Sequence, residues 1–454
     1  MIKALHRTRL PQVVFAFAVI ACQPEENIKI QKPPLPSCNK VFMDGYADRT
    51  SYYPGDVANV FIESWSLLEC GLGIYDSRGN LAFVSDANLS PQDKSTNEPW
   101  KYGFNFSVFS EIKLPSDLAS GVYFIEMQIP IVVKSPAPAD VTVVFPYNTI
   151  NAYNPSGGKS LYGFNSTNAT GSEIVSFLRP LVDESETGRC NECIKWFPTL
   201  ADIKMNYVSD LDLDDYNSFG NSKVLVIVGH SEYWTRKARQ NFDKFVEGGG
   251  HSVLLSGNSM WWQVRYSENR DQLICYRNAT NDPEPDQKMK TILWTEPTLD
   301  FPIAKSIGAD FNGGGYGLQI DNGWDGFKIA NPNSPLLEGL NLKRSDIIHV
   351  PSVECDGAPI KGFDADGFPV LDNKYNFEKF ELIGYDKGTR AGAVTYPTFI
   401  VMKATPTSGI IVNMAACDWC SSACVGQPSS GGALKTITKN AIKKLITGSP
   451  IFSN

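Results

Sequence analysis

The residue types best suited to chemistry occur in one short segment, Gly229-His230-Ser231-Glu232-Tyr233-Trp234. An imidazole and a carboxylate two residues apart in a tight loop can face the same crevice, where one ligates a metal ion and the other moves protons. A second interpretation is structural, with His230 and Glu232 capping the helix that follows. Both interpretations depend on the elements that flank the segment.

The segment follows the most apolar run of the chain, residues 224–228 (VLVIV), which predicts a buried strand. Residues 235–247 carry apolar side chains at helical spacing, and three glycines end this predicted helix. Residues 252–256 predict the next strand, so the three elements form a βαβ unit with parallel strands. His230 and Glu232 therefore stand at the carboxyl end of a strand, where open α/β sheets bind their ligands.

The same logic extends to the rest of the chain. Residues 38–138 predict an all-β sandwich, because short strand-like runs alternate with turn sequences. Residues 139–454 predict an α/β domain, with a helix at 173–179 and later strands near 381–385, 399–403 and 409–413. The predicted fold class is α/β with an all-β N-terminal sandwich. Its open, mostly parallel sheet resembles the class I glutamine-amidotransferase-like fold.

Three further segments carry tyrosine, asparagine and tryptophan. Residues 151–162 (NAYNPSGGKSLY) form a glycine-rich loop that contains Tyr153 and Tyr162. Gly121-Val122-Tyr123 opens a predicted strand of the sandwich, and residues 256–262 (SGNSMWW) contain Asn258. Each tyrosine alone is typical of a half-buried core residue. The combination of the segments is more specific than any one of them.

Together these segments resemble the N,N-dimethylformamidase large (beta) subunit family. The resemblance rests on the AYN…GG.SLY loop, the H-x-E-Y-W element and the G-N turn followed by aromatic residues, and it extends over roughly residues 42–450. The enzyme of that family holds a mononuclear iron through two tyrosines and one glutamate. The resemblance therefore implies hydrolysis of a linear amide C–N bond.

Carried over residue by residue, the resemblance implies Tyr153 and Glu232 as two of the iron ligands. It implies Tyr123 as the other tyrosine ligand, with Tyr162 as the alternative. Phenolate and carboxylate oxygens are hard donors that suit Fe(III). A ligand from the sandwich and two from the sheet would place the site between the two predicted domains, a common place for a pocket.

The resemblance also implies residues that act beside the iron. His230 is the expected proton carrier, with Glu232 in the catalytic pair, and Asn258 and Trp234 are expected to bind substrate. Ser231 and Ser256 stand where the family usually has proline and glycine.

Residues 1–21 predict a targeting segment. A basic start precedes an apolar stretch at 10–21, which is shorter than the roughly 20 residues needed to span a bilayer. The segment ends in Val19-Ile20-Ala21-Cys22, which resembles a bacterial lipoprotein box. We therefore predict lipidation of Cys22, a tether at 22–37 and attachment to the periplasmic or surface face of the cell envelope. The alternative is an ordinary secretory signal with an unrelated cysteine.

Charge and cysteine content narrow the function classes. The formal charge is −8, and it becomes −11 if residues 1–21, with three basic and no acidic side chains, are removed. An acidic chain is a poor ligand for nucleic acid.

The cysteines of Cys190-x-x-Cys193 and Cys417-x-x-Cys420-x-x-x-Cys424 suit zinc or disulfides, and an oxidising compartment favours disulfides. No G-x-S-x-G elbow occurs, so the sequence does not support an α/β-hydrolase triad.

The predicted function is iron-dependent hydrolysis of a small amide by a cell-envelope lipoprotein. The alternative is a non-catalytic surface lipoprotein that binds a carbohydrate or another ligand and keeps the family scaffold. The expected partners are a small amide or a surface glycan, the membrane through Cys22, and either a small partner subunit or further copies of the chain.

Overall fold

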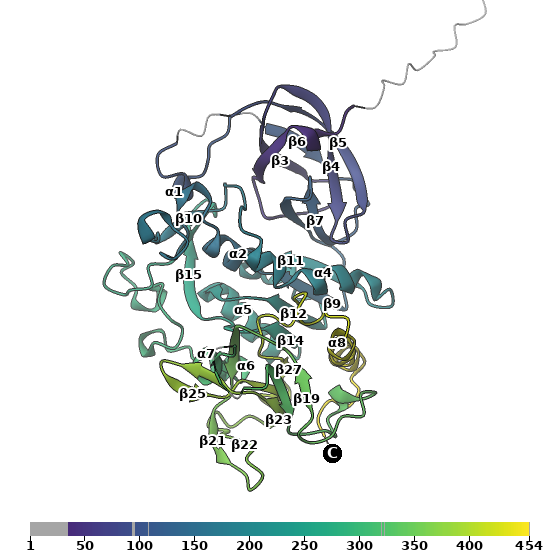
Figure 1. Cartoon of the computed structure of the whole chain (residues 1–454), viewed down its shortest axis with the longest axis vertical. Helices are drawn as coiled ribbons and strands as arrows, with labels where there is room; N and C mark the ends of the chain where they lie inside the picture. Colours follow the sequence, from purple (N-terminus) through teal and green to yellow (C-terminus); the bar gives the residue numbers. More distant parts are fainter. Residues whose placement is uncertain (1–34, 93–95, 108, 319, 322, 454) are drawn as a thin grey trace, which may run out of the picture. The chain divides into compact units, whose positions relative to one another are not determined.

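A nine-stranded mixed sheet contains the strand that leads to His230 (Figure 1). The computed structural model describes residues 35–453, apart from 93–95, 108, 319 and 322. Five neighbouring strands are parallel, in the order β11 (Met205–Ser209), β9 (Val141–Phe145), β12 (Val224–Gly229), β14 (His251–Ser256) and β27 (Ile410–Asn413). Four more continue the sheet by antiparallel pairing, in the order β26 (Thr398–Lys403), β23 (Lys379–Tyr385), β18 (Gly326–Ile329) and β19 (Ile347–His349).

The predicted βαβ unit is confirmed. Strand β12, helix α5 (Arg236–Glu247) and β14 follow one another, and β12 pairs in parallel with β14. The three valines of β12 face the core that contains helix α8 (Gly431–Thr447), whereas Leu225 and Ile227 face the core that contains α5. Because successive side chains of a strand point to opposite faces, α5 and α8 cover opposite faces of the sheet.

The prediction of an open, mostly parallel sheet of the glutamine-amidotransferase-like class is wrong. The chain is mostly β, in several mixed sheets, and only about 21% of it is helical. Parallel neighbours need a crossover of a dozen or more residues, usually with a helix. Only residues 404–409 separate β26 from β27, and a β-hairpin occupies most of the connection from β23 to β26, so these strands pair antiparallel.

Two further sheets occupy residues 42–133 (Figure 1). One contains β1 (Phe42–Ala47), β3 (Val57–Ser64) and β6 (Phe109–Lys113). The other contains β2 (Ser51–Tyr52), β8 (Ile129–Val133), β7 (Gly121–Ile125), β4 (Leu68–Asp76) and β5 (Leu81–Leu89). Side chains from both sheets share one core. Residues 35–454 form a single compact unit by their contacts, and the domain limits 38–138 and 139–454 stay a prediction.

Short elements complete the chain. A four-stranded sheet contains β10 (Ile174–Ser176), β16 (Gln272–Ile274), β15 (Trp262–Tyr266) and β13 (Tyr233–Thr235), and another contains β20 (Glu354–Gly357), β17 (Gly315–Tyr316), β24 (Gly388–Arg390) and β25 (Ala393–Thr395). Strands β21 (Ile360–Phe363) and β22 (Pro369–Leu371) pair with each other. The remaining helices are α1 (Pro99–Tyr102), α2 (Tyr147–Tyr153), α3 (Ser185–Gly188), α4 (Asn191–Trp196), α6 (Ile303–Ile307) and α7 (Phe311–Gly314).

The prediction of a helix at 173–179 is wrong. This segment contains β10, which pairs antiparallel with β16.

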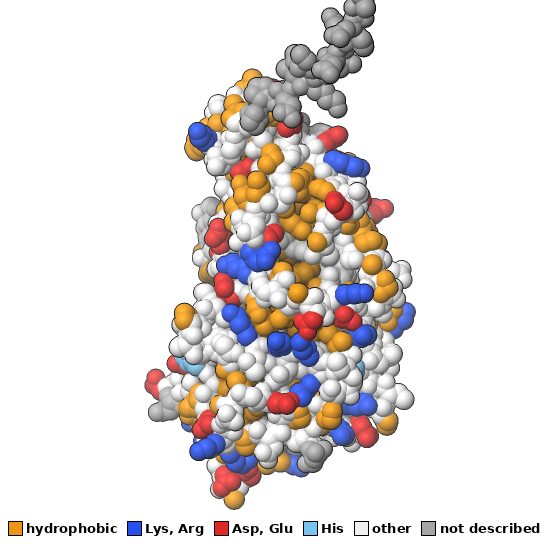
Figure 2. Space-filling view, turned by 90° about the vertical axis from the view of Figure 1, so that its right-hand side faces the viewer, with side chains coloured by type: hydrophobic (Ala, Val, Ile, Leu, Met, Phe, Trp, Pro, Cys, Tyr) orange, Lys and Arg blue, Asp and Glu red, His pale blue; other side chains and the backbone are white. Residues whose placement is uncertain are grey.

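The predicted signal segment 1–21, Cys22 and tether residues up to 34 lie outside the described residues. Within the described part of the chain, no helix has the length and apolar character required to cross a membrane. Figure 2 shows acidic and basic side chains interspersed over one face of the molecule. Charges of one sign do not gather into a patch on that face.

A disulfide between Cys38 and Cys70 ties the start of the described chain to β4. The two cysteines are 32 residues apart, and closing a loop of this length in the unfolded chain stabilises the fold by about 3–4 kcal/mol. We expect Cys38→Ser to lower the free energy of unfolding by this amount in urea denaturation. The double variant with Cys70→Ser should lose no more than the single variant. A loss below about 1 kcal/mol would show that the bridge does not support the fold.

Candidate functional site

His230 and Glu232 leave the sheet at a sharp turn after β12. Gly229 has φ +68°, and a Cβ atom there would lie 3.0 Å from the Cβ of Cys190, so this turn needs glycine. Both His230 and Glu232 are buried, and the backbone N–H of Glu232 donates to Thr149 Oγ1 at 3.0 Å. The N-cap of α5 is Thr235. His230 and Glu232 therefore do not cap the helix.

Two tyrosines from the glycine-rich loop meet Glu232. Tyr153, the last residue of α2, donates its hydroxyl to Glu232 Oε2 at 3.0 Å. Tyr162 donates to Glu232 Oε1 at 3.0 Å, and the two tyrosine rings lie 4.4 Å apart. Tyr233 donates to the Tyr162 hydroxyl at 2.5 Å. Phenol oxygens from two positions of this loop thus meet the buried carboxylate of Glu232.

Tyr123 lies elsewhere. It belongs to β7, packs in the core shared by the two N-terminal sheets, and donates its hydroxyl to the Ala119 carbonyl at 2.9 Å. The structure brings Tyr162, the alternative tyrosine of the sequence analysis, to Glu232. The difference arises because residues 154–161 fold back beside α2.

Asn258 reaches the site and Trp234 does not. The Asn258 amide nitrogen donates to Glu354 Oε2 at 3.0 Å, while its buried Oδ1 atom has no hydrogen-bond partner. Trp234 points into the core beneath α5, where its ring packs against Phe242, and its indole N–H donates to Ser231. Trp234 therefore supports the turn rather than lining the site.

Two carboxylates that the sequence motifs did not predict flank His230. The Nδ1 atom of His230 lies 2.9 Å from Glu186 Oε2, in α3. Its Nε2 atom lies 2.9 Å from Glu354 Oε2, in β20, and 3.4 Å from Glu232 Oε2. Neither Glu186 nor Glu354 belongs to a recognisable motif, so only the fold could reveal them.

A chain of charges continues outward from Glu186. Arg189 donates its Nε–H to Glu186 Oε1 at 3.2 Å and also forms an ion pair with Asp418. Asp418 in turn accepts the backbone N–H of Val353 at 2.8 Å, next to the start of β20. This outer support fixes the position of Glu186, and through it the ring of His230.

Burial and neighbouring charges shift the pKa values of His230, Glu232 and Tyr153. Burial raises the pKa of Glu232 to about 7, with the His230 charge opposing and Glu354 adding to the rise. Burial lowers the pKa of His230, but the carboxylates of Glu186 and Glu354 outweigh it, so the pKa lies well above its usual value. Burial and the neighbouring Glu232 raise the pKa of Tyr153 well above its usual range. The imidazolium is thus held between two carboxylates.

Arg179 holds the tyrosine-bearing loop in place. Its guanidinium is fully buried and donates to the backbone carbonyls of Asn151, Ser156 and Lys159 at 2.7–2.8 Å. Burial without an ion pair lowers its pKa to about 9. A single side chain thereby connects α2, which ends at Tyr153, to the loop residues that precede Tyr162.

The donor set at this point consists of two phenols and one carboxylate. Among the described residues, no group of three or more His, Cys, Asp or Glu side chains has an arrangement that could hold a metal ion. Tyr153, Tyr162 and Glu232 form a different set, in which two of the three side chains are tyrosines. The fold and the site define a mixed-sheet protein in which two partly buried tyrosines meet a buried glutamate beside a paired histidine.

The chain belongs to the N,N-dimethylformamidase beta subunit-like family, because the sequence model of that family's C-terminal region matches residues 73–430. The match confirms the resemblance drawn from the sequence motifs, and it includes the cluster and the carboxylates on both sides of His230. The comparison with individually curated proteins gave no match.

Proposed function

We propose that the protein hydrolyses the C–N bond of a small linear amide with the help of iron. The observation that carries the proposal is the convergence of the Tyr153, Tyr162 and Glu232 oxygens next to His230. Membership of the dimethylformamidase-like family supports the same activity. We also propose that the protein is exported and lipid-anchored at Cys22. Its partner would be a small subunit, as the beta-subunit name of the family suggests.

The residues present fit a ferric ion. Tyr153, Tyr162 and Glu232 are hard oxygen donors. Glu232 is buried, the two tyrosines are partly buried, and each phenol oxygen lies 3.0 Å from a carboxylate oxygen of Glu232. These three side chains would hold the iron. When bound, it would polarise an amide carbonyl and lower the pKa of a water molecule.

The side chains around the cluster supply the proton chemistry. Glu186 accepts the Nδ1 proton of His230, so the proton that His230 gives or takes is the one on Nε2. That atom lies 2.9 Å from Glu354 Oε2 and 3.4 Å from Glu232 Oε2. We propose that Nε2 delivers a proton to the departing amine nitrogen.

Substrate size and orientation follow from burial. Asn258 Oδ1 is buried and unpaired, so it is a suitable acceptor for an N–H group of the substrate. The ring of Phe164 lies 5.5 Å from that of Tyr162 and is 76% exposed, which places an aromatic side chain on the solvent side of the cluster. A partly buried cluster with an aromatic side chain on its solvent side favours a small amide over a polymer.

Amine release from small N-alkyl and primary amides tests the proposal. We expect the iron-loaded protein to release an amine from N-alkyl amides or ammonia from primary amides, and we expect His230→Gln to lower kcat by about 10²- to 10⁴-fold while iron stays bound. His349→Gln is the matched control, because His349 is exposed and should leave kcat unchanged. An iron-loaded protein that binds amides without releasing amine, or a His230→Gln variant with kcat within a few-fold of the wild type, would contradict the proposal.

A further inference from the structure

Five buried cysteines gather near the carboxyl end of β12, in α4, at its N-cap and in residues 417–424. Four of them have oxygen partners. Cys190 donates to the Thr187 carbonyl at 3.2 Å, Cys417 contacts Asp418 Oδ2 at 3.2 Å, and Cys424 contacts the Pro351 carbonyl at 3.8 Å. Cys420 contacts the Leu255 carbonyl at 3.9 Å, and the fifth cysteine is Cys193.

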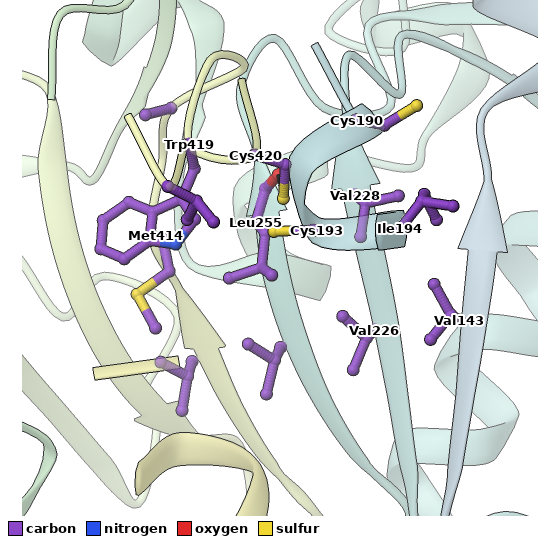
Figure 3. Close-up of a cluster of buried hydrophobic side chains, with 14 of the residues drawn as sticks. Val143, Cys190, Cys193, Ile194, Val226, Val228, Leu255, Met414, Trp419 and Cys420 are labelled. Atoms are coloured by element: carbon purple, nitrogen blue, oxygen red, sulfur yellow. Dashed lines mark hydrogen bonds between the residues drawn. The ribbon is translucent and has the colours of Figure 1, made fainter. Parts of the chain in front are cut away.

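The thiols of Cys193 and Cys420 contact each other. Figure 3 shows their sulfur atoms facing one another, with the sulfur of Cys190 turned away. The backbone draws the same segments together, because the N–H of Glu192 donates to the Cys420 carbonyl at 3.0 Å. Both side chains are fully buried beside Ile194, so no solvent separates them.

We propose that Cys193 and Cys420 form a disulfide when the protein folds in an oxidising compartment. Each thiol loses its hydrogen, an S–S bond forms, and the two electrons reduce a small-molecule disulfide to two thiols through a mixed disulfide on one cysteine. Burial raises the pKa of the Cys420 thiol, which makes the reactive thiolate scarce in the folded protein. The exchange therefore takes place before this region closes.

The bridge would stabilise the ion pairs of Arg189 with Glu186 and Asp418, which lie next to His230. It would join α4 to the segment that contains Asp418, whose ion pair with Arg189 supports Glu186 and, through it, His230. It would also close a much longer loop than the Cys38–Cys70 bridge does, which restricts the unfolded chain further. Zinc is disfavoured, since the described residues contain no group of three suitable ligands.

A disulfide map tests the inference without any assay of activity. The purified full-length protein is refolded in a mixture of reduced and oxidised glutathione, alkylated while denatured, and digested without reduction for mass spectrometry. We expect a Cys193–Cys420 linked peptide beside the Cys38–Cys70 one, and an intact mass that lacks two more hydrogens than the Cys38–Cys70 bridge alone explains. Cys193→Ser should leave Cys420 fully alkylated, whereas Cys190→Ser should keep the linked peptide.

Three results would overturn the inference. Alkylation of both Cys193 and Cys420 in the refolded wild-type protein would show that no bridge forms. A linked peptide between Cys190 and either cysteine would assign a different bridge. Stoichiometric zinc that protects the thiols from alkylation would assign a metal site instead. The wild-type map decides between these results even where a serine variant does not fold.

Discussion

Tyr162→Phe should leave the protein without its iron. The variant removes a phenol oxygen that lies 3.0 Å from Glu232 Oε1 and keeps the ring that packs against Tyr153. Removing an outer-shell partner of a metal ligand already costs 10- to 100-fold in affinity, so loss of a ligand should weaken iron binding by at least about 100-fold. Titration with a ferric salt, followed by the visible absorption of the Fe(III)–tyrosinate pair, measures the effect.

Tyr123→Phe is the matched control, because it removes the hydroxyl of the other candidate tyrosine. That hydroxyl donates to the Ala119 carbonyl in the N-terminal core, away from Glu232. We expect this variant to bind iron like the wild type, and Tyr153→Phe to behave like Tyr162→Phe. The opposite pattern, with iron lost from Tyr123→Phe and kept by Tyr162→Phe, would show that the proposed ligand set is wrong.

Arg179→Met should destabilise the protein more than the other substitutions considered. The change removes the guanidinium donor from the carbonyls of Asn151, Ser156 and Lys159. The Asn151 carbonyl keeps the backbone N–H of Asn154, and the Lys159 carbonyl is partly buried. Each unsatisfied buried group costs about 1–3 kcal/mol, so we expect the free energy of unfolding to fall by about 3–5 kcal/mol in urea denaturation. Iron affinity should fall with it, since the same loop carries Tyr153 and Tyr162.

Arg239→Met provides a matched control for a buried arginine. Arg239 is also fully buried, donates to the Phe301 carbonyl at 2.8 Å and stacks over the Phe301 ring at 4.0 Å, in the core beneath α5. We expect this variant to lose stability and keep iron affinity while folded. An Arg179→Met variant that keeps both its stability and its iron affinity would show that Arg179 does not hold the loop.

The fold was predictable where one pattern dominates locally. Residues 224–228 are apolar at every position and form β12. Because a helix connects β12 to β14, the two strands run in the same direction and pair in parallel. Residues 173–179 were not predictable in this way, because their apolar side chains fit a helix as well as the strand that pairs with β16. The antiparallel half of the sheet was missed because its connections, rather than its strands, decide the direction.

The site was predictable in part for a similar reason. His230, Glu232 and Tyr153 lie in recognisable motifs, and the structure places them within contact of one another. Glu186 and Glu354 are distant in sequence and carry no motif, and only the tertiary fold brings them to the two nitrogens of His230. The choice between Tyr123 and Tyr162 also needed the path of the loop.

The iron content of the purified wild-type protein tests the central claim most directly. The account predicts about one iron per chain, a visible absorption band from tyrosinate bound to Fe(III), and loss of the band when a chelator removes the metal. A colourless, iron-free protein that stays colourless and inactive toward amides after incubation with a ferric salt would contradict it.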